Sequence, residues 1–126
     1  MKQKILSNNA PQPIGPYSQA IKVNNIIFIS GQIAIDPETN TLIKNDIVQE
    51  TKMVMENIKN ILIQSNCTLE NVVKCSIFLS DMNLFESVNE VYGSYFNHPY
   101  PARETIEVAK LPKSVNIEIS AIAICK

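Results

Sequence analysis

The last quarter of the chain, residues 101–125, constrains the fold more than any other stretch. It holds two runs in which apolar and polar residues alternate, 101–111 and 115–125, separated by the Pro-containing segment 112–114. A period of two is typical of β-strands, and two such runs around a short turn-forming segment predict a β-hairpin with a longer loop. The chain must therefore build a sheet, and its end supplies two of the strands.

The second of these runs is apolar on both faces, which is unusual for a sheet surface that contacts water. One face carries Val115, Ile117, Ile119, Ala121 and Ala123, and the opposite face carries Glu118, Ser120, Ile122 and Ile124. In the first run, Arg103 and Thr105 alternate with Ile106. We expect Arg103 and Glu118 to share the second face, and a second copy of the chain to cover it. The charged pair would then lie in a cleft between chains.

Length and charge limit the class of protein. A chain of 126 residues is predicted to form one domain, residues 1–126, with enough buried surface to fold without disulfides or bound metal ions. The formal net charge is −1 at pH 7. Without a basic excess to neutralise phosphates, a dedicated nucleic-acid binder is disfavoured.

The cysteines and the N-terminal residues indicate the cellular compartment of the protein. Cys67, Cys75 and Cys125 are odd in number and include no CxxC spacing, which argues against a disulfide framework and against a structural zinc site. We expect reduced thiols in a cytoplasmic protein. Residues 1–7 lack a long apolar run and a cleavage site of small residues, so no signal peptide or membrane span is predicted.

Two helices and several strands are predicted between the ends. Residues 20–23 and 26–30 read as a hairpin around an Asn-Asn turn, with Gly31 marking a bulge. A helix is expected from a capping box at Asp46 and Gln49, with Glu50 on its polar face. A second helix is expected from Asn83 and Glu86. Residues 72–80 read as a strand, whose inward face is predicted to carry Val73, Cys75, Ile77 and Leu79.

This order of elements predicts an α+β domain. Two helices packed on one face of a mixed sheet of about six strands is the natural layering. The other face of the sheet then needs a cover, which again favours an oligomer.

Few residues are left to carry chemistry. Gly-rich phosphate loops and clustered metal ligands are absent, and a Ser-His-Asp triad would have to use His98, the only histidine. Arg103 can pair with a carboxylate through two parallel hydrogen bonds, and Glu118 can hold and deprotonate a water. A plain ion pair explains the same two residues about equally well from the pattern alone. The apolar neighbours favour a site, because burying a charge is costly.

Five segments together resemble the RidA/YjgF family, the reactive intermediate deaminases. They are residues 14–20 (IGPYSQA), 29–33 (ISGQI), 101–103 (PAR), 108–113 (VAKLPK) and 117–119 (IEI). The resemblance covers essentially the whole chain, in the same order and spacing. It implies a chorismate-mutase-like fold and a homotrimer with three sites at the subunit interfaces.

The resemblance also implies an activity and a role for each site residue. The family hydrolyses 2-imino or enamine acids, such as 2-iminobutanoate and 2-iminopropanoate, to 2-keto acids and ammonia, without a cofactor or a metal. Arg103 would bind the substrate carboxylate and Glu118 would position the attacking water. Five further residues would line the pocket: Tyr17, Ser30, Gly31, Asn89 and Thr105.

Two positions depart from the family pattern. Glu104 stands where a small or apolar residue is usual, and alternation predicts that its side chain points away from that of Arg103. Thr105 replaces a cysteine found in many deaminating members. Two other functions stay open: a non-catalytic ligand-binding or chaperone-like trimer, and an endoribonuclease or translation inhibitor, against which the acidic composition weighs.

Overall fold

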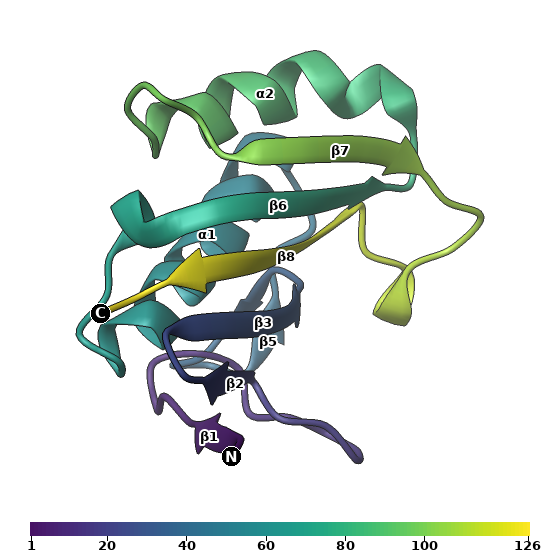
Figure 1. Ribbon diagram of the computed structural model, residues 1–126. Coiled ribbons are helices and arrows are strands. Elements are labelled where there is room, and N and C mark those ends of the chain that lie inside the picture. Colours follow the sequence, from purple (N-terminus) through teal and green to yellow (C-terminus); the bar gives the residue numbers. More distant parts are fainter.

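A six-stranded sheet forms the centre of the molecule in the computed structural model, which describes residues 1–126 (Figure 1). The strand order is β1-β2-β3-β8-β6-β7, and only the β6–β7 pair is parallel. The bounds are β1 Gln3–Ile5, β2 Ala20–Val23, β3 Ile26–Gln32, β6 Val72–Leu79, β7 Ala102–Glu107 and β8 Ile117–Ile124. A separate small hairpin pairs β4, Ile35–Asp36, with β5, Thr41–Leu42. The predicted mixed sheet of about six strands is confirmed.

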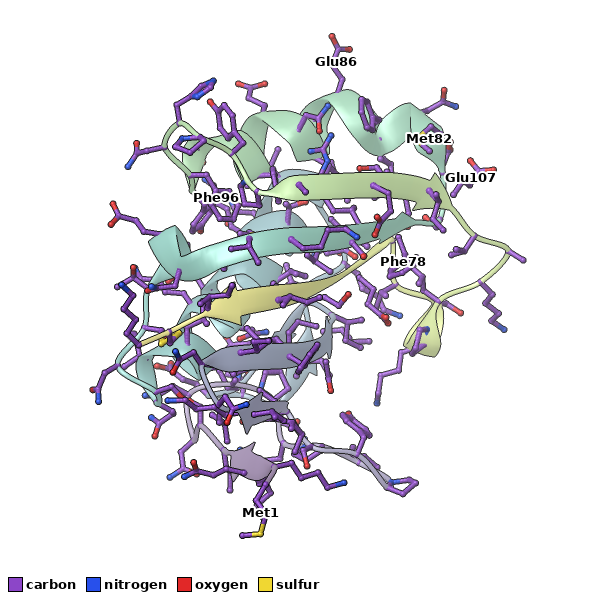
Figure 2. All side chains as sticks on the ribbon, viewed as in Figure 1. Met1, Phe78, Met82, Glu86, Phe96 and Glu107 are labelled. Atoms are coloured by element: carbon purple, nitrogen blue, oxygen red, sulfur yellow. A yellow bond between two sulfur atoms is a disulfide. The ribbon has the colours of Figure 1, made fainter.

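Two α-helices, α1 (Ile47–Ile63) and α2 (Phe85–Ser94), pack on one face of this sheet, as predicted (Figure 1). Three short 3-10 helices complete the chain: η1 Leu69–Asn71, η2 Met82–Leu84 and η3 Pro112–Ser114. Side chains fill the space between helices and sheet, whereas Glu86 extends outward from α2 (Figure 2). None of the helices combines the length and apolarity needed to cross a membrane.

The helix starts follow the expected chemistry in one case and not in the other. The carboxylate of Asp46 accepts a hydrogen bond from the backbone N–H of Val48 at 2.9 Å, so Asp46 caps α1 as predicted. The side chain of Gln49 makes no reciprocal hydrogen bond, so the predicted capping box is incomplete. The predicted cap at Asn83 is wrong. Asp81 accepts from the N–H of Asn83 at 2.9 Å and caps η2, which runs directly into α2. The extra 3-10 turn moves the cap two residues upstream.

The predicted terminal hairpin is also wrong. Both strands form, but β6 lies between β7 and β8 and pairs with each of them. The connection between β7 and β8, residues 108–116, includes η3 and is long enough to cross the end of β6. Alternation identifies strands, but it does not say which strands are neighbours.

The core lies between the sheet and the helices. The apolar face of β8 is buried as expected, at Val115, Ile117, Ile119, Ala121 and Ala123. On β6, Cys75, Ile77 and Leu79 are buried but Val73 is exposed. A register shift between Val72 and Lys74 turns Val73 outward and places Val72 in the core instead.

The opposite side of the sheet, which we call the open face, is covered by no helix. Four large apolar side chains on it, those of Ile26, Phe28, Ile106 and Ile124, remain 38–46% exposed. Ile26 pairs with Ile124 and Phe28 with Ile122 across β3 and β8, so these side chains adjoin one another. Ile106 lies on the edge strand β7, where it pairs with Phe78. The apolar second face that the alternation predicted is therefore present.

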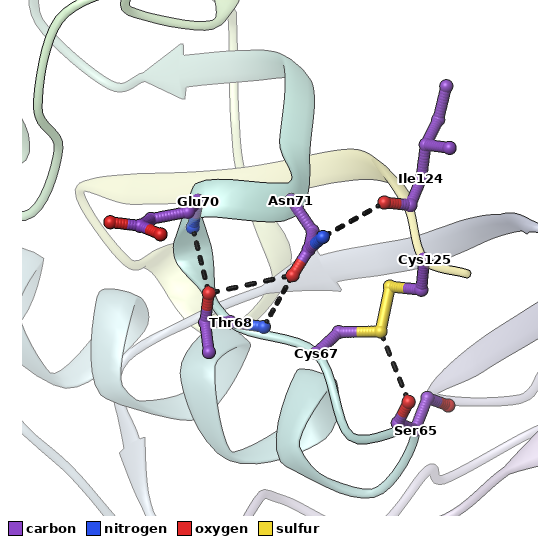
Figure 3. Close-up of a disulfide and its surroundings, with 7 residues drawn as sticks. All are labelled: Ser65, Cys67, Thr68, Glu70, Asn71, Ile124 and Cys125. Carbon is purple, nitrogen blue, oxygen red and sulfur yellow. Dashed lines mark hydrogen bonds between the residues drawn. A yellow bond between two sulfur atoms is a disulfide. The ribbon is translucent and has the colours of Figure 1, made fainter.

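A disulfide corrects the expectation of three reduced cysteines. Cys67, after α1, is bonded to Cys125, after β8 (Figure 3). Cys75 remains a free, buried thiol. Both bonded cysteines are almost fully buried. Nearby, the Asn71 side-chain amide donates to the carbonyl of Ile124 at 3.1 Å. The end of the chain is thus fixed to the segment that follows α1, a pairing of residues 58 positions apart that spacing alone did not reveal.

Candidate functional site

A cavity of about 450 Å³ lies where the loop 11–17 meets β3 and the start of β8. We call it the Glu118 cavity. Four of the predicted site residues line it together: Tyr17, Ser30, Gly31 and Glu118. The other lining residues are Pro11, Gln12, Ile14, Gln19, Gln32, Ile33, Ile35, Pro112 and Lys113.

The loop that carries Tyr17 is held in place by the buried side chain of Gln19. Its Oε1 accepts from the N–H of Ser7 at 2.6 Å, and its Nε2 donates to the carbonyls of Ser7 at 3.1 Å and Pro11 at 2.8 Å. The hydroxyl of Ser30 donates to the carbonyl of Ser18 at 2.6 Å. Ser30 therefore ties the loop to β3, and only its acceptor capacity is left for a ligand.

Gly31 allows Glu118 to lie against β3. A Cβ atom at position 31 would lie only 2.7 Å from Cδ of Glu118, so any side chain there would displace the carboxyl group. The register shift between Ile29 and Gln32 confirms the bulge predicted at this glycine. Burial raises the pKa of Glu118 above its ordinary value, because a partly desolvated carboxylate is less stable than the neutral acid.

A buried carboxylate positions the strand that bears Glu118. Glu50, predicted on the polar face of α1, is fully buried and accepts from the backbone N–H and the side-chain amide of Asn116, at 2.9 and 3.0 Å. The prediction for Glu50 is wrong because it sits where α1 faces the entry to β8. Lys113 and Ser114, just before this entry, both have φ of 56°, in the left-handed region.

The second predicted catalytic residue, Arg103, lies in another pocket. This Arg103 pocket, of about 490 Å³, is lined by Asn89, Tyr92, Gly93, Tyr100, Pro101 and Arg103. Nη1 of Arg103 donates to Oδ1 of Asn89 at 2.7 Å. The guanidinium carbon lies 5.0 Å from the centroid of the Tyr92 ring and 5.6 Å from that of Phe85, within the range of cation–π attraction.

Thr105 follows Arg103 on the same side of β7. Its hydroxyl oxygen is buried and has no hydrogen-bond partner, as is also true of the Tyr92 hydroxyl. Buried hydroxyls without partners are uncommon. Both lie near the only arginine of the chain.

Arg103 and Glu118 do not share a face of the sheet, so this part of the prediction is wrong. Arg103 pairs in register with the buried Cys75 and faces α2, whereas Glu118 pairs with Phe78 on the open face. The alternation along 101–111 was read correctly, but Ile106 rather than Arg103 points outward. Successive side chains of the edge strand β7 point to opposite sides of the sheet. Ile106 points to the open face, so Arg103 points toward the helices. Within one chain, the two predicted catalytic residues, Arg103 and Glu118, therefore lie in separate pockets.

Glu104 lies away from Arg103, as predicted. It is on the open face, where its carboxylate accepts from the Ser76 hydroxyl and pairs with Nζ of Lys74 at 3.0 Å. The hydrogen bond from Ser76 and the neighbouring Lys74 lower the pKa of Glu104, so it stays ionised. The departure at position 104 thus leaves the Arg103 pocket unchanged.

Sequence reasoning missed several residues that shape the two pockets. Phe85, Tyr92 and Gln19 were not among the predicted site residues. The signal for the first two was their spacing around Asn89, at offsets of four and three on one helix face. No group of three or more His, Cys, Asp or Glu side chains lies close enough together to bind a metal ion.

This small α+β domain thus carries two pockets, one around Arg103 and one around Glu118. Comparison with known proteins identifies the family. A model described as Endoribonuclease L-PSP matches residues 7–125. The chain belongs to this family, the RidA/YjgF family.

Individual relatives match over nearly their whole length. A RutC family protein of Pyrococcus horikoshii is 54% identical over 123 residues, 98% of each chain. The 2-iminobutanoate/2-iminopropanoate deaminase of the mouse is 43% identical over 124 residues, 98% of this chain and 92% of the relative. The crystal structure of Escherichia coli TdcF with bound serine superposes with a TM-score of 0.94 at 35% identity, covering 98% of this chain and 99% of TdcF.

Proposed function

We propose that this protein hydrolyses reactive 2-imino acids, such as 2-iminobutanoate and 2-iminopropanoate, to 2-keto acids and ammonia. The observation that carries the proposal is that the chain presents two complementary groups, each lining a pocket. Arg103 offers a fixed guanidinium with free donors, and Glu118 offers a carboxyl group whose pKa burial raises. The mouse relative that bears this activity in its name, and the bound serine of TdcF, support a 2-amino or 2-imino acid as the ligand.

The proposal requires an assembly, since Arg103 and Glu118 lie on different sides of one chain. We propose a homotrimer in which the open face packs against its neighbours and brings Arg103 of one copy to the Glu118 cavity of the next. The exposed apolar side chains of the open face support this, because a patch of that kind is seldom left in water. A closed ring of three identical contacts gives three equivalent sites.

The chemistry needs orientation and one base. Arg103 would bind the substrate carboxylate through two parallel hydrogen bonds, which fixes C2 next to Glu118. Glu118 in its carboxylate form would accept a proton from water as the oxygen attacks C2 of the protonated imine. The Glu118 carboxyl would return its proton to the amino group of the carbinolamine, the C–N bond would break, and the hydroxyl proton would pass to the departing ammonia as the 2-keto group forms. One protonated imino acid and one water thus give one 2-keto acid and one ammonium ion.

The remaining pocket residues would shape the site around this step. Tyr17 would cover one side of the substrate, and the backbone at Gly31 would approach it closely. Ser30 would hold the Tyr17 loop and Asn89 would hold Arg103, as their hydrogen bonds indicate. The unpartnered hydroxyl of Thr105 would gain a ligand contact.

A coupled assay tests the proposal. A threonine dehydratase generates 2-iminobutanoate in the presence of semicarbazide, and formation of the semicarbazone is followed. We expect the protein to suppress semicarbazone formation and the Arg103→Ala variant to have lost this effect. An inactive native protein that still binds 2-ketobutanoate would instead indicate a non-catalytic binding trimer. RNA cleavage that persists after rigorous removal of contaminating nucleases would support the endoribonuclease reading.

A further inference from the structure

We propose that Phe85, Asn89 and Tyr92 form a cage that holds the guanidinium of Arg103 with its Nε–Nη2 edge turned to the substrate carboxylate. This inference rests on the proposed function for the identity of the ligand. The cage itself is a property of the free protein. None of the three residues is assigned a chemical step, so they act as positioning residues.

The three cage residues share one face of α2. Residues 85, 89 and 92 are four and three positions apart, which places their side chains in one row on one face of the helix. This face is the one beside β7, since the side chains of all three residues contact Arg103. The helix thus presents an aromatic ring, an amide and a second ring to one arginine.

The three contacts leave most of the N–H groups of Arg103 free. Two ring faces, at 5.0 and 5.6 Å, attract the cation without using any of its N–H groups. Asn89 uses one N–H, on Nη1, at 2.7 Å. No protein group accepts from Nε or Nη2. The five donors of an arginine lie in one plane, so fixing Nη1 and the ring contacts also fixes the direction of this free edge.

The ring of Tyr92 is fixed in place by burial. Its side chain is only 4% exposed, so the ring against Arg103 is held by the core and cannot follow a moving guanidinium. Burial and the neighbouring Cys75 raise the pKa of Tyr92, which keeps the phenol neutral. Without this cage, a flexible arginine would have to be ordered each time a substrate binds, which weakens binding.

Because Arg103 is the only arginine, its side chain can be observed directly. In protein labelled with ¹⁵N-arginine, we expect one Nε signal shifted by the ring currents of Phe85 and Tyr92, with slow rotation of the Nη groups. Asn89→Ala should speed this rotation, and Tyr92→Leu should move the Nε signal toward that of free arginine. Tyr95→Leu is the control, because it removes a ring at the end of α2 that has no contact with Arg103. A native spectrum like that of free arginine would overturn the cage, whether or not the protein is a deaminase.

Titration with 2-ketobutanoate tests the direction of the free edge. We expect Tyr92→Leu and Asn89→Ala to weaken binding about fivefold to thirtyfold, the range of one lost cation–π or charged hydrogen bond, and Tyr92→Phe to recover most of the loss. Asn89→Asp should bind worse than Asn89→Ala, because a carboxylate at position 89 would compete with that of the ligand for Arg103. Equal binding by the native protein and these variants would overturn the proposed role of the cage. Failure of the native protein itself to bind, with the caged spectrum intact, would instead count against the proposed function.

Discussion

Breaking the Cys67–Cys125 disulfide should weaken the fold substantially while leaving its architecture in place. The bond closes a loop between residues 58 positions apart in the sequence. Reduction leaves both thiols in the core, where small apolar groups are well accommodated. The loss should therefore arise mainly from the greater conformational freedom of the unfolded chain.

The size of this effect follows from the loop length. The chain-entropy relation for a loop of this size gives about 4 kcal/mol at 25 °C. That is a large part of the total stability of an ordinary domain, roughly 5–15 kcal/mol. A fall of this size should clearly lower the urea concentration at the midpoint of unfolding. The reduced and oxidised proteins should be compared at the same protein concentration, because assembly also contributes to stability.

Two assays check this prediction. Thiol titration of protein purified without reductant should find one reactive thiol, Cys75, after denaturation, and three after reduction. Reductant should lower the urea midpoint of the native protein and of Cys75→Ala. It should leave the midpoint of a variant carrying both Cys67→Ser and Cys125→Ser unchanged. Three reactive thiols in unreduced, denatured protein would refute the disulfide, and an unchanged midpoint after reduction would refute the entropy argument.

Three further predictions concern the elements around Glu118. Glu50→Ala should destabilise the fold by about 3–5 kcal/mol in urea unfolding, since it removes two hydrogen bonds to a buried carboxylate, whereas Glu50→Gln keeps one acceptor and should cost less; equal costs would contradict this. Gly31→Ala should lower deaminase activity about a hundredfold with little change in stability, because Cβ displaces the Glu118 carboxyl; unchanged activity would show that its position is not critical. For Glu118, a folded pKa above the ordinary 4.5 means that the folded state binds more protons, so this residue's contribution to stability is lost as pH rises from about 4.5 through the raised pKa. Glu118→Gln should therefore be more stable than the native protein at pH 7 while inactive, and the acid limb of native activity should lie above pH 4.5; a less stable variant would reverse the sign of the argument.

Local patterns in the sequence were sufficient for most of the elements. The period of α1, the strands on either side of Asn24 and the buried face of β8 all depend on neighbours close in sequence. Gly31 could be read as a bulge because a glycine inside an apolar strand has few other uses. The grouping of Tyr17, Ser30 and Gly31 in one pocket came instead from the resemblance to the RidA/YjgF family.

Features that depend on which strands are neighbours could not be predicted in this way. Alternation separates Arg103 from Ile106 but does not say which of them faces the helices, and that choice decided whether Arg103 and Glu118 shared a face. The insertion of β6 between β7 and β8 has no local signal either. The same applies to the bond between Cys67 and Cys125, and to Glu50, whose partner Asn116 is 66 residues away.

The most direct test of the central claim mixes two inactive variants, Arg103→Ala and Glu118→Ala. If each site takes Arg103 from one copy and Glu118 from its neighbour, random mixed trimers at equal proportions should regain about a quarter of the native sites, as follows from the symmetry of a ring. The two variants kept apart should stay inactive in the semicarbazide assay. No recovery in trimers that contain both variants would contradict a site shared between copies.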